Sequence, residues 1–363
     1  MTFRYLVTFK PLTPYFFGGM HSFGYGERVN YLVKSVRYPQ QTTLLGVIRR
    51  ILIEQALPAL RADRRYSEDE KKTINHLIGN NGFTFISEPA EPASYGIIKS
   101  ISPLWLVKEG QEARLWVPKP LDYEYQIKEL ATAHSMEKQN ILLFDKFNPK
   151  EGCRSGWITP DKTMLLEDSL IGCTTQVGIR RLNSRKNESG ENVADQDYYK
   201  QEFCVMKDPS LAFACWMHLS EPYAWNNQGV VPIGGERTPY SYHIHDSQAS
   251  TMDPDDYSWS EHKDLLSAAS SISRIVLLSD TYLPSQDLHK YAQQSIVSLV
   301  PFRYLQSSDT GKNKRTDKLF QLLQRGSVLY TKDPTSLINK IKSYGVLHNI
   351  GFNHCHLIRE RGH

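Results

Sequence analysis

The segment 1–58 constrains the fold most, because it places a strand, a glycine-rich stretch and an amphipathic helix in one order. Residues 3–9 (FRYLVTF) are β-branched and aromatic with alternation, as expected of a β-strand. Residues 11–27 mix glycine, proline and aromatic residues without a helical period. Thr42 and Thr43 can cap a helix that ends before Pro58, and its apolar residues share one stripe. The chain is therefore expected to open as strand, loop and helix.

Strands and helices are predicted to alternate irregularly along the rest of the chain. Further strands are expected at 82–87, 95–107, 211–219, 274–280 and 327–332, and helices at 121–143, 286–299, 316–325 and 334–343. With its opening order, this pattern predicts an α+β fold of two ferredoxin-like (RRM-like) domains with long insertions. We expect the domains to cover residues 1–175 and 176–363.

Size and composition indicate a cytoplasmic protein without a membrane span. The 363 residues are enough for two domains. No apolar run approaches the ~18–20 residues that a transmembrane helix needs, and the N-terminus lacks the features of a signal peptide. The five cysteines form no C-x-x-C pair, and their odd number argues against a disulfide framework.

The charge of the chain is concentrated at its beginning. Residues 1–50 carry a net charge of +6, which leaves −2 for the rest of a chain whose total is +4. The basic residues of this head are Arg4, Lys10, Arg28, Lys34, Arg37, Arg49 and Arg50. Such asymmetry is typical of a site for a polyanion, although a solvated basic surface would explain it equally well.

Gly46 and Arg50 share the polar face of the predicted first helix. A glycine within a helix costs roughly 0.5–1 kcal/mol relative to alanine, so it often marks a close approach. Near a helix N-terminus, a bare surface with an arginine one turn away could seat a phosphate. The alternative is a helix start that tolerates glycine beside a surface arginine.

Residues 178–200 are predicted to form a β-hairpin that projects from the body. The segment is too polar to bury, and Tyr198 and Tyr199 supply an apolar return strand. Its basic residues are Arg180, Arg181, Arg185 and Lys186. Cationic side chains of this kind hold RNA phosphates, so the hairpin is a candidate RNA contact.

Seven short motifs, in order along nearly the whole chain, resemble the RAMP superfamily of CRISPR-associated RNA-binding proteins. They are PYFFGG, TTLLGVIRRIL, QVGIRRLNSRKNESG, PIGGERTPY (232–240), RIVLLSDTYLP (274–284), RGSVLYTK (325–332) and IGFNH (350–354). Within the superfamily the chain is most similar to subunit three of type III-B (Cmr) effector complexes. In that family, the QVGIRR segment opens a β-hairpin thumb.

The resemblance implies a non-catalytic RNA-binding subunit without a cofactor. Such a subunit holds the 5′ tag of the crRNA, docks to the large polymerase/cyclase-like subunit, abuts the backbone subunit and meets target RNA in the assembled complex. Together with the charge pattern, it gives these candidate RNA-binding residues: Arg28, Lys34, Arg37, Gly46, Arg49, Arg50, Arg180, Arg181, Arg185, Lys186, Arg237 and Gly351.

Three other functions are weighed against this one. A metal-independent endoribonuclease that processes CRISPR repeat RNA needs a general base and a general acid, and His21 near Tyr25 and Lys34 is the only candidate. The pairs His243/His245 and His354/His356 lack a second pair at zinc spacing, so no metal site is predicted. A pure protein scaffold would leave the basic head unexplained.

Overall fold

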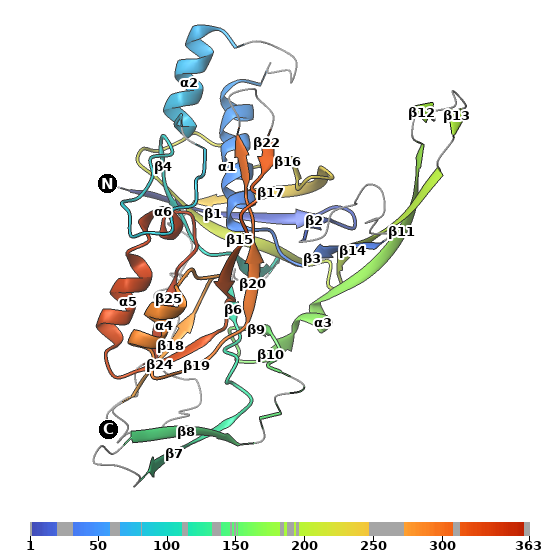
Figure 1. Ribbon diagram of the computed structural model, residues 1–363. Coiled ribbons are helices and arrows are strands. Elements are labelled where there is room, and N and C mark those ends of the chain that lie inside the picture. Colours follow the sequence, from blue (N-terminus) through green and yellow to red (C-terminus); the bar gives the residue numbers. More distant parts are fainter. Residues whose placement is uncertain are drawn as a thin grey trace.

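The computed structural model describes residues 2–19, 32–58, 66–80, 82–110, 115–132, 139–145, 147–148, 150, 152–181, 185–186, 192–193, 196–246, 272–307 and 313–358. It is rich in sheet and has few helices, and its helices and strands are shown in Figure 1. The α+β class predicted from the sequence is confirmed. No helix of these residues is long and apolar enough to cross a membrane.

A nine-stranded sheet forms the centre of the molecule, in the order β10-β9-β6-β5-β15-β1-β17-β16, with β4 also beside β15. Its strands are β1 (Phe3–Pro11), β4 (Ile98–Ile101), β5 (Trp105–Lys108), β6 (Leu115–Pro118), β9 (Gly156–Ile158), β10 (Met164–Leu166), β15 (Leu211–Leu219), β16 (Gln228–Ile233) and β17 (Thr238–Asp246). The strand β1 lies between β15 and β17 and is antiparallel to both. Residues on either side of position 176 therefore share one sheet.

Helices α1 (Gln41–Ala56) and α2 (Glu68–Ile78) belong to the layer on one face of this sheet (Figure 1). The apolar stripe of α1 packs with Val7 and Phe9 of β1 in one core cluster, which confirms the helix predicted from its period. Its buried apolar residues are Leu44, Leu45, Val47, Ile48, Ile51 and Leu52. In α2, Ser67 and Glu70 form a capping box that satisfies the first backbone N–H groups.

A second, four-stranded sheet has the order β19-β24-β18-β25. Its strands are β18 (Ser273–Leu277), β19 (Gln294–Ile296), β24 (Val328–Thr331) and β25 (Cys355–Ile358), and its helices are α4 (Ser285–Tyr291), α5 (Pro334–Lys342) and α6 (Gly345–His348). Pro334 at the start of α5 and an N-cap bond from the Ser336 N–H to Asp333 (3.0 Å) explain why that helix begins there.

The two sheets pack face to face. Side chains alternate between the two faces of each strand, so one face of the small sheet packs on the large sheet and the other on α5. Leu6 and Trp216 of the large sheet share a core cluster with Val276 and Tyr330 of the small one. The intervening residues point the other way, so that Leu277 packs with the apolar residues of α5 in a separate cluster. The layers are thus α1 and α2, large sheet, small sheet, and α5.

A buried ion pair joins the sheets at this interface. Arg274 of β18 is 5% exposed, and its guanidinium makes a bidentate contact with fully buried Asp122, with Nε to Oδ2 at 2.6 Å. The hydroxyl of Tyr330 donates to the same carboxylate at 2.5 Å. Because Asp122 follows β6 of the large sheet, this network holds the connection between β6 and β7 against the small sheet.

The hairpin predicted at 178–200 is confirmed, and it is longer than expected. Strands β11 (Ile171–Arg181) and β14 (Gln196–Met206) pair antiparallel from Ile171↔Met206 to Arg181↔Gln196. They project from the body in Figure 1, with β12 (Arg185–Lys186) and β13 (Asn192–Val193) at the far end. The ribbon starts at α3 (Glu167–Leu170) and joins β3 (Leu32–Val36) and β2 (Phe17–Gly18) in one sheet.

Three short pairs of strands lie outside the larger sheets, and two of the pairs include residues where helices were expected. They are β7 (Gln126–Thr132) with β8 (Gln139–Asp145), β20 (Leu299–Phe302) with β23 (Phe320–Leu323), and β21 (Leu305–Ser307) with β22 (Asn313–Arg315). The helix predicted at 121–143 is wrong, because its residues pair antiparallel as β7 and β8. The helix at 316–325 is wrong because β23 pairs with β20, while 334–343 is confirmed by α5.

We predict that Arg274→Ala lowers the free energy of unfolding by about 3–5 kcal/mol, because it leaves Asp122 buried without its charged partner. The matched control is Arg50→Ala, which removes an exposed ion pair with Glu54 on α1 and should cost about 0.3–0.5 kcal/mol. Denaturant unfolding of the full chain measures both values. Equal losses for the two variants would show that the ion pair contributes little to holding the sheets together.

Candidate RNA interface

Two adjoining hollows lie at the N-terminal end of α1. The larger, here the α1 groove, has a volume of about 630 Å³ and is lined by α1, the turn between β16 and β17, and residues 303–305. The smaller, here the Arg325 pocket, has a volume of about 330 Å³. Both are lined by Gly18, Val36, Gln40 and Arg303, so they form one continuous surface. Residues from both halves of the chain thus meet at α1.

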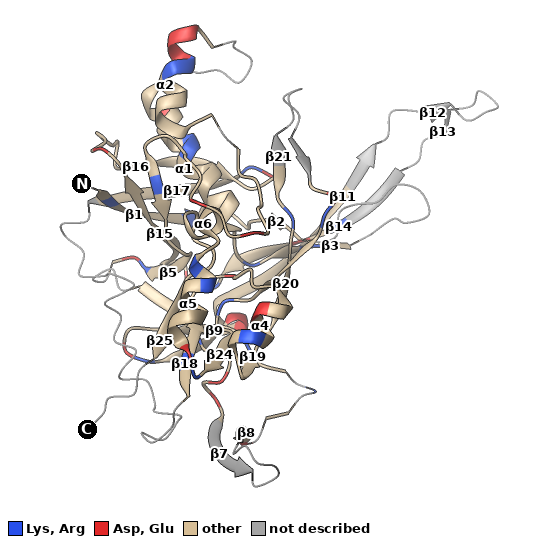
Figure 2. Cartoon of the chain, turned by 60° about the vertical axis from the view of Figure 1, so that its left-hand side comes forward, with Lys and Arg blue, Asp and Glu red and all other residues tan. Residues whose placement is uncertain are grey.

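The first turn of α1 offers backbone donors to this surface. No side chain caps the helix at Gln40, and its first turn contains no acidic residue. Thr42 and Thr43 line the groove. By contrast, α2 begins with three acids, which appear red at its free end in Figure 2. An uncapped N-terminus without a local carboxylate attracts anions such as phosphate.

Among the described residues, the charged side chains that line the α1 groove are Arg49, Arg50 and Arg303, and none of its lining residues is acidic. Arg303 is half-buried, and its Nε has no hydrogen-bond partner among the described residues. Arg50 is exposed, and its Nε donates to Glu54 at 2.6 Å. The groove therefore presents a positive surface that suits a polyanion.

Arg49 has a structural task as well. Its guanidinium donates to the Ile78 carbonyl at 3.0 Å and lies over the Tyr95 ring, 4.8 Å from its centroid. Burial lowers the pKa of Arg49, as expected for a cation withdrawn from water. The side chain thus links α1 to the end of α2.

Glycines keep part of the groove bare. A Cβ added at Gly46 or Gly235 would meet no atom within 4 Å, so both positions face open space. Gly46 is therefore not a point of close helix packing. It instead leaves the surface of the groove bare at this position. Gly234 differs, because its φ is +80° and a Cβ there would lie 2.8 Å from the Phe16 carbonyl.

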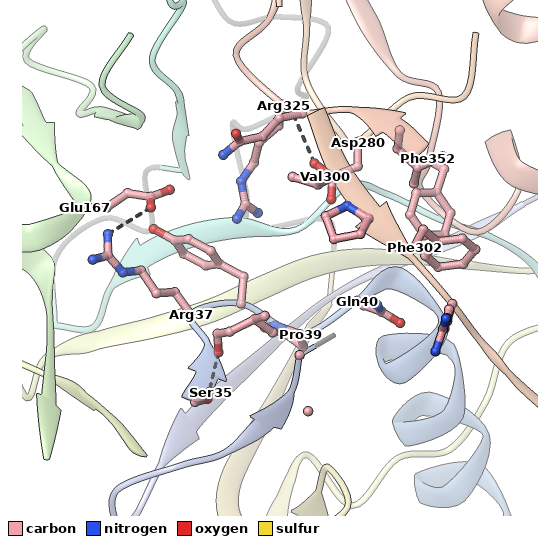
Figure 3. Close-up of a pocket in the computed structure, with 18 residues that line it drawn as sticks. Ser35, Arg37, Pro39, Gln40, Glu167, Asp280, Val300, Phe302, Arg325 and Phe352 are labelled. Carbon is pink, nitrogen blue, oxygen red and sulfur yellow. Dashed lines mark hydrogen bonds and ion pairs between the residues drawn. The ribbon is translucent and has the colours of Figure 1, made fainter. Parts of the chain in front are cut away.

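The Arg325 pocket is built around a stacked arginine (Figure 3). The Arg325 guanidinium lies 3.8 Å from the centroid of the Tyr38 ring, and the Tyr38 hydroxyl accepts a hydrogen bond from Trp157 Nε1 at 2.7 Å. The backbone N–H of Arg325 donates to Asp280 at 3.0 Å. Burial raises the pKa of Asp280, and Arg325 opposes that rise. Planar cations of this kind also stack on nucleobases.

Two of the predicted RNA-binding residues near the pocket already have acidic partners. Arg37 lines the pocket and pairs with Glu167 at 3.1 Å and with Asp168. Lys34 on β3 is exposed, 4.0 Å from Glu202. Arg237 lies at the turn between β16 and β17 with a φ of +52°, exposed to solvent. Of the twelve predicted positions, Gly46, Arg49 and Arg50 line the groove and Arg37 the pocket.

The basic residues of the hairpin are placed by their backbone. Arg180 and Arg181 end β11, and Arg185 and Lys186 form β12. Their side chains lie outside the described part of the structure, as does the whole of Arg28. The sheet that joins β11 to β2 and β3 leads from the hairpin to the two hollows.

Gly351 is not part of this surface. It is buried with a φ of +90°, and a Cβ there would lie 2.4 Å from the Ser102 carbonyl. It allows a tight turn after α6 and has no surface for direct contact with RNA. Phe16 and Phe17, two aromatic residues in the lining of the α1 groove, are also almost fully buried, at 6% and 5% exposure.

Sequence reasoning missed Arg303 and Arg325. The motif RGSVLYTK begins with Arg325, but nothing in it indicates stacking on Tyr38, which lies far away in the chain. Arg303 follows β20 without a motif around it. Only the fold brings both residues to the start of α1.

The rival ribonuclease site cannot be built from described residues. His21 and Tyr25 lie outside them. Among the described residues, no three His, Cys, Asp or Glu side chains are placed to hold a metal ion. The rings of His243 and His245 are stacked 6.3 Å apart, and the two hollows contain no histidine in their linings. The surface can hold phosphates and bases through arginines and N–H groups.

Comparison with solved structures found similar chains at low identity. Two cryo-EM structures of the type III-B Cmr-beta complex contain chains similar to this one at 13% identity. For the complex bound to cognate target RNA, the match covers 97% of this chain and 96% of that chain with a TM-score of 0.48. For the complex bound to cognate target RNA and AMPPnP, it covers 96% and 94% with a TM-score of 0.47.

No curated protein sequence matches the chain. Residues 7–360 match the model of the family described as CRISPR-associated protein (Cas_Cmr3). This match confirms the resemblance to subunit three of type III-B complexes. Because it spans nearly the whole chain, the protein belongs to the Cmr3 family of CRISPR-associated proteins.

Proposed function

We propose that this chain is a non-catalytic RNA-binding subunit of a type III-B CRISPR effector complex, in which it holds the 5′ tag of the crRNA. The observation that carries the proposal is the α1 groove. Three arginines and an uncapped helix N-terminus line it together, and none of its described lining residues is acidic. Such a surface binds single-stranded RNA through phosphates and needs no reactive side chain.

Base contacts are proposed for the Arg325 pocket. Arg325 is already positioned 3.8 Å from the centroid of the Tyr38 ring and 5.3 Å from that of the Trp157 ring, so a base that enters the pocket would stack on its guanidinium at little conformational cost. Its neighbours Arg37 and Glu167 neutralise each other. Phosphates would therefore prefer the α1 groove, and a base would enter the less charged pocket.

We propose that the hairpin of β11 and β14 is a thumb that adds RNA contacts beyond the α1 groove. Arg180 and Arg181 lie at the outer end of the long pairing, followed by Arg185 and Lys186. A ribbon that leaves the body buries little apolar surface, so its stability gains from a partner. RNA that lies across the groove would meet these four cations beyond the edge of the body.

The proposed partners follow from the family. The subunit would dock to the large polymerase/cyclase-like subunit and to the backbone subunit, with target RNA bound in the assembled complex. Catalysis would belong to those other subunits. We place the protein in the cytoplasm, where its five cysteines, none of them in a disulfide, would stay reduced.

We also propose that the chain consists of two ferredoxin-like units. In chain order, β18, α4, β19, β24, α5 and β25 follow the β-α-β-β-α-β sequence of that fold, with the strand order 2-3-1-4. The strands β1, β5, β15 and β17 have the same order in the large sheet. The division would then lie between β17 and β18, and not after residue 175 as expected from the sequence.

Substitutions of the two arginines of α1, Arg50 and Arg49, should have different effects on RNA binding and on stability. Arg50→Ala is expected to weaken binding of tag RNA and to reduce the slope of log K against log[salt] by about 0.7, the value for one lost phosphate contact on a single strand. Stability should stay almost unchanged, because the side chain is exposed. RNA titrations at several salt concentrations measure the slope.

Arg49→Ala is the comparison variant. It should lower the free energy of unfolding by about 1.5–3 kcal/mol, because it removes a charged hydrogen bond to Ile78. Lys332→Ala, on an exposed residue outside both hollows, serves as the control for non-specific charge. An unchanged slope for Arg50→Ala would place the RNA elsewhere.

Removal of the hairpin tip tests the thumb. Replacement of residues 182–195 by a short Gly-Ser linker should leave the Tm nearly unchanged, because the pairing of β11 with β14 from Ile171 to Arg181 remains. Retention of tagged crRNA by the purified complex should fall sharply, because two of the four basic residues are lost. If the variant unfolds, the tip supports the body; if crRNA retention is normal, the thumb does not hold the tag.

A further inference from the structure

A third cavity lies at the opposite end of β1, where the edges of the two sheets meet. Its volume is about 250 Å³, and it shares no lining residue with the α1 groove or the Arg325 pocket. Its polar and charged lining residues are Arg4, Ser100, Ser102, His218, Lys342, His348, His354 and Cys355. Trp105 and Trp216 supply an apolar wall.

One wall is a row of side chains across the large sheet. Arg4 is directly opposite His218, and His218 is opposite Ser100, so the three lie side by side on neighbouring strands. His218 Nδ1 lies 3.0 Å from the Ser100 hydroxyl. The Arg4 guanidinium lies over the Trp216 ring at 4.7 Å from its centroid. Leu6, two residues after Arg4 on β1, points to the same face and packs against the small sheet. The row therefore also faces the small sheet.

The other wall comes from α5, α6 and the loop before β25. The rings of His348 and His354 stack with centroids 4.0 Å apart and planes 14° from parallel. His348 Nδ1 donates to the Asn353 carbonyl at 3.1 Å, and His354 Nε2 donates to the His348 carbonyl at 3.0 Å. These bonds hold both imidazoles in place. Exposed Lys342, the last residue of α5, stands at the entrance.

The lining contains two cationic side chains, Arg4 and Lys342, together with three histidines. No aspartate or glutamate among the described residues lines the cavity. Burial, with His348, Lys342 and His218 close by, lowers the pKa of His354 to about 3. In this environment the addition of a further positive charge is costly, and the addition of a negative charge is favourable.

An independent observation also indicates a ligand. Trp216 is 1% exposed and lines the cavity, and its indole Nε1–H has no hydrogen-bond acceptor among the described residues. A buried donor without an acceptor costs about 1–3 kcal/mol, which a bound acceptor would recover. A zinc ion does not fit, because the described histidines and Cys355 form no cluster of three metal ligands.

We propose that this cavity binds a phosphate group, through Lys342, Arg4 and the Trp216 indole, between walls formed by His218 and the stacked pair His348 and His354. Its volume is below the ~300–1,000 Å³ of common small-molecule pockets, so it fits one phosphate group with little more than its immediate substituent. The group comes either from a free nucleotide or from RNA. This site is separate from the crRNA surface at α1 and does not depend on the function proposed for it.

Titration of the full chain with inorganic phosphate, AMP and a short single-stranded RNA tests the proposal. The imidazole carbon-bound proton signals of the histidines report binding by NMR, with chloride at equal ionic strength as the reference. We expect saturable shifts for His218, His348 and His354. Lys342→Ala should weaken binding about tenfold, which corresponds to about 1.4 kcal/mol. The matched control Lys332→Ala should bind as the wild type does.

The three probes identify the source of the phosphate. Saturation by phosphate and AMP indicates a free nucleotide, whereas saturation by RNA alone indicates a phosphodiester. Arg4→Met, with its Tm measured beside it, is a second variant that should lose binding of inorganic phosphate while Lys332→Ala keeps it. Absence of saturable shifts with all three probes, or equal affinity in Lys342→Ala and wild type, would overturn the proposal. Failure of the α1 groove to bind tag RNA would not affect this result.

Discussion

The packing of the small sheet against the large one is the interaction on which the rest of the structure depends. Leu6 and Trp216 pack against Val276 and Tyr330 in a shared core. The Arg274–Asp122 pair holds the connection after β6 against β18. Burial of apolar side chains supplies most of the stabilisation. The ion pair adds specificity of position, since a bidentate contact tolerates little displacement.

This packing also creates the candidate RNA interface. The first turn of α1 comes from the beginning of the chain, while Arg303 and Arg325 follow β20 and β23 near its end. Neither half alone forms the α1 groove or the Arg325 pocket. The phosphate cavity proposed around His354 is likewise lined by residues from both halves of the chain.

Sequence patterns predicted the elements whose signals lie within one short segment of the chain. The apolar stripe of α1 and the tyrosines that close the hairpin were sufficient to find α1 and the pairing of β11 with β14. The segment 121–143 was misjudged as helix, since its pattern does not reveal the pairing of β7 with β8. Gly351 was assigned to RNA from the resemblance of IGFNH to a family motif, since its buried contact with Ser102 is invisible in sequence. Arg303 was missed because its position depends on distant packing.

Sequencing of the RNA that copurifies with the assembled complex tests the central claim most directly. Complexes that contain the wild-type chain should retain RNA with a uniform, repeat-derived 5′ end. Complexes with Arg303→Glu should assemble but lose that RNA, because the substitution places a carboxylate in a groove lined by arginines. Normal recovery of tagged RNA with Arg303→Glu, in a complex of unchanged composition, would contradict the assignment of the α1 groove to the crRNA.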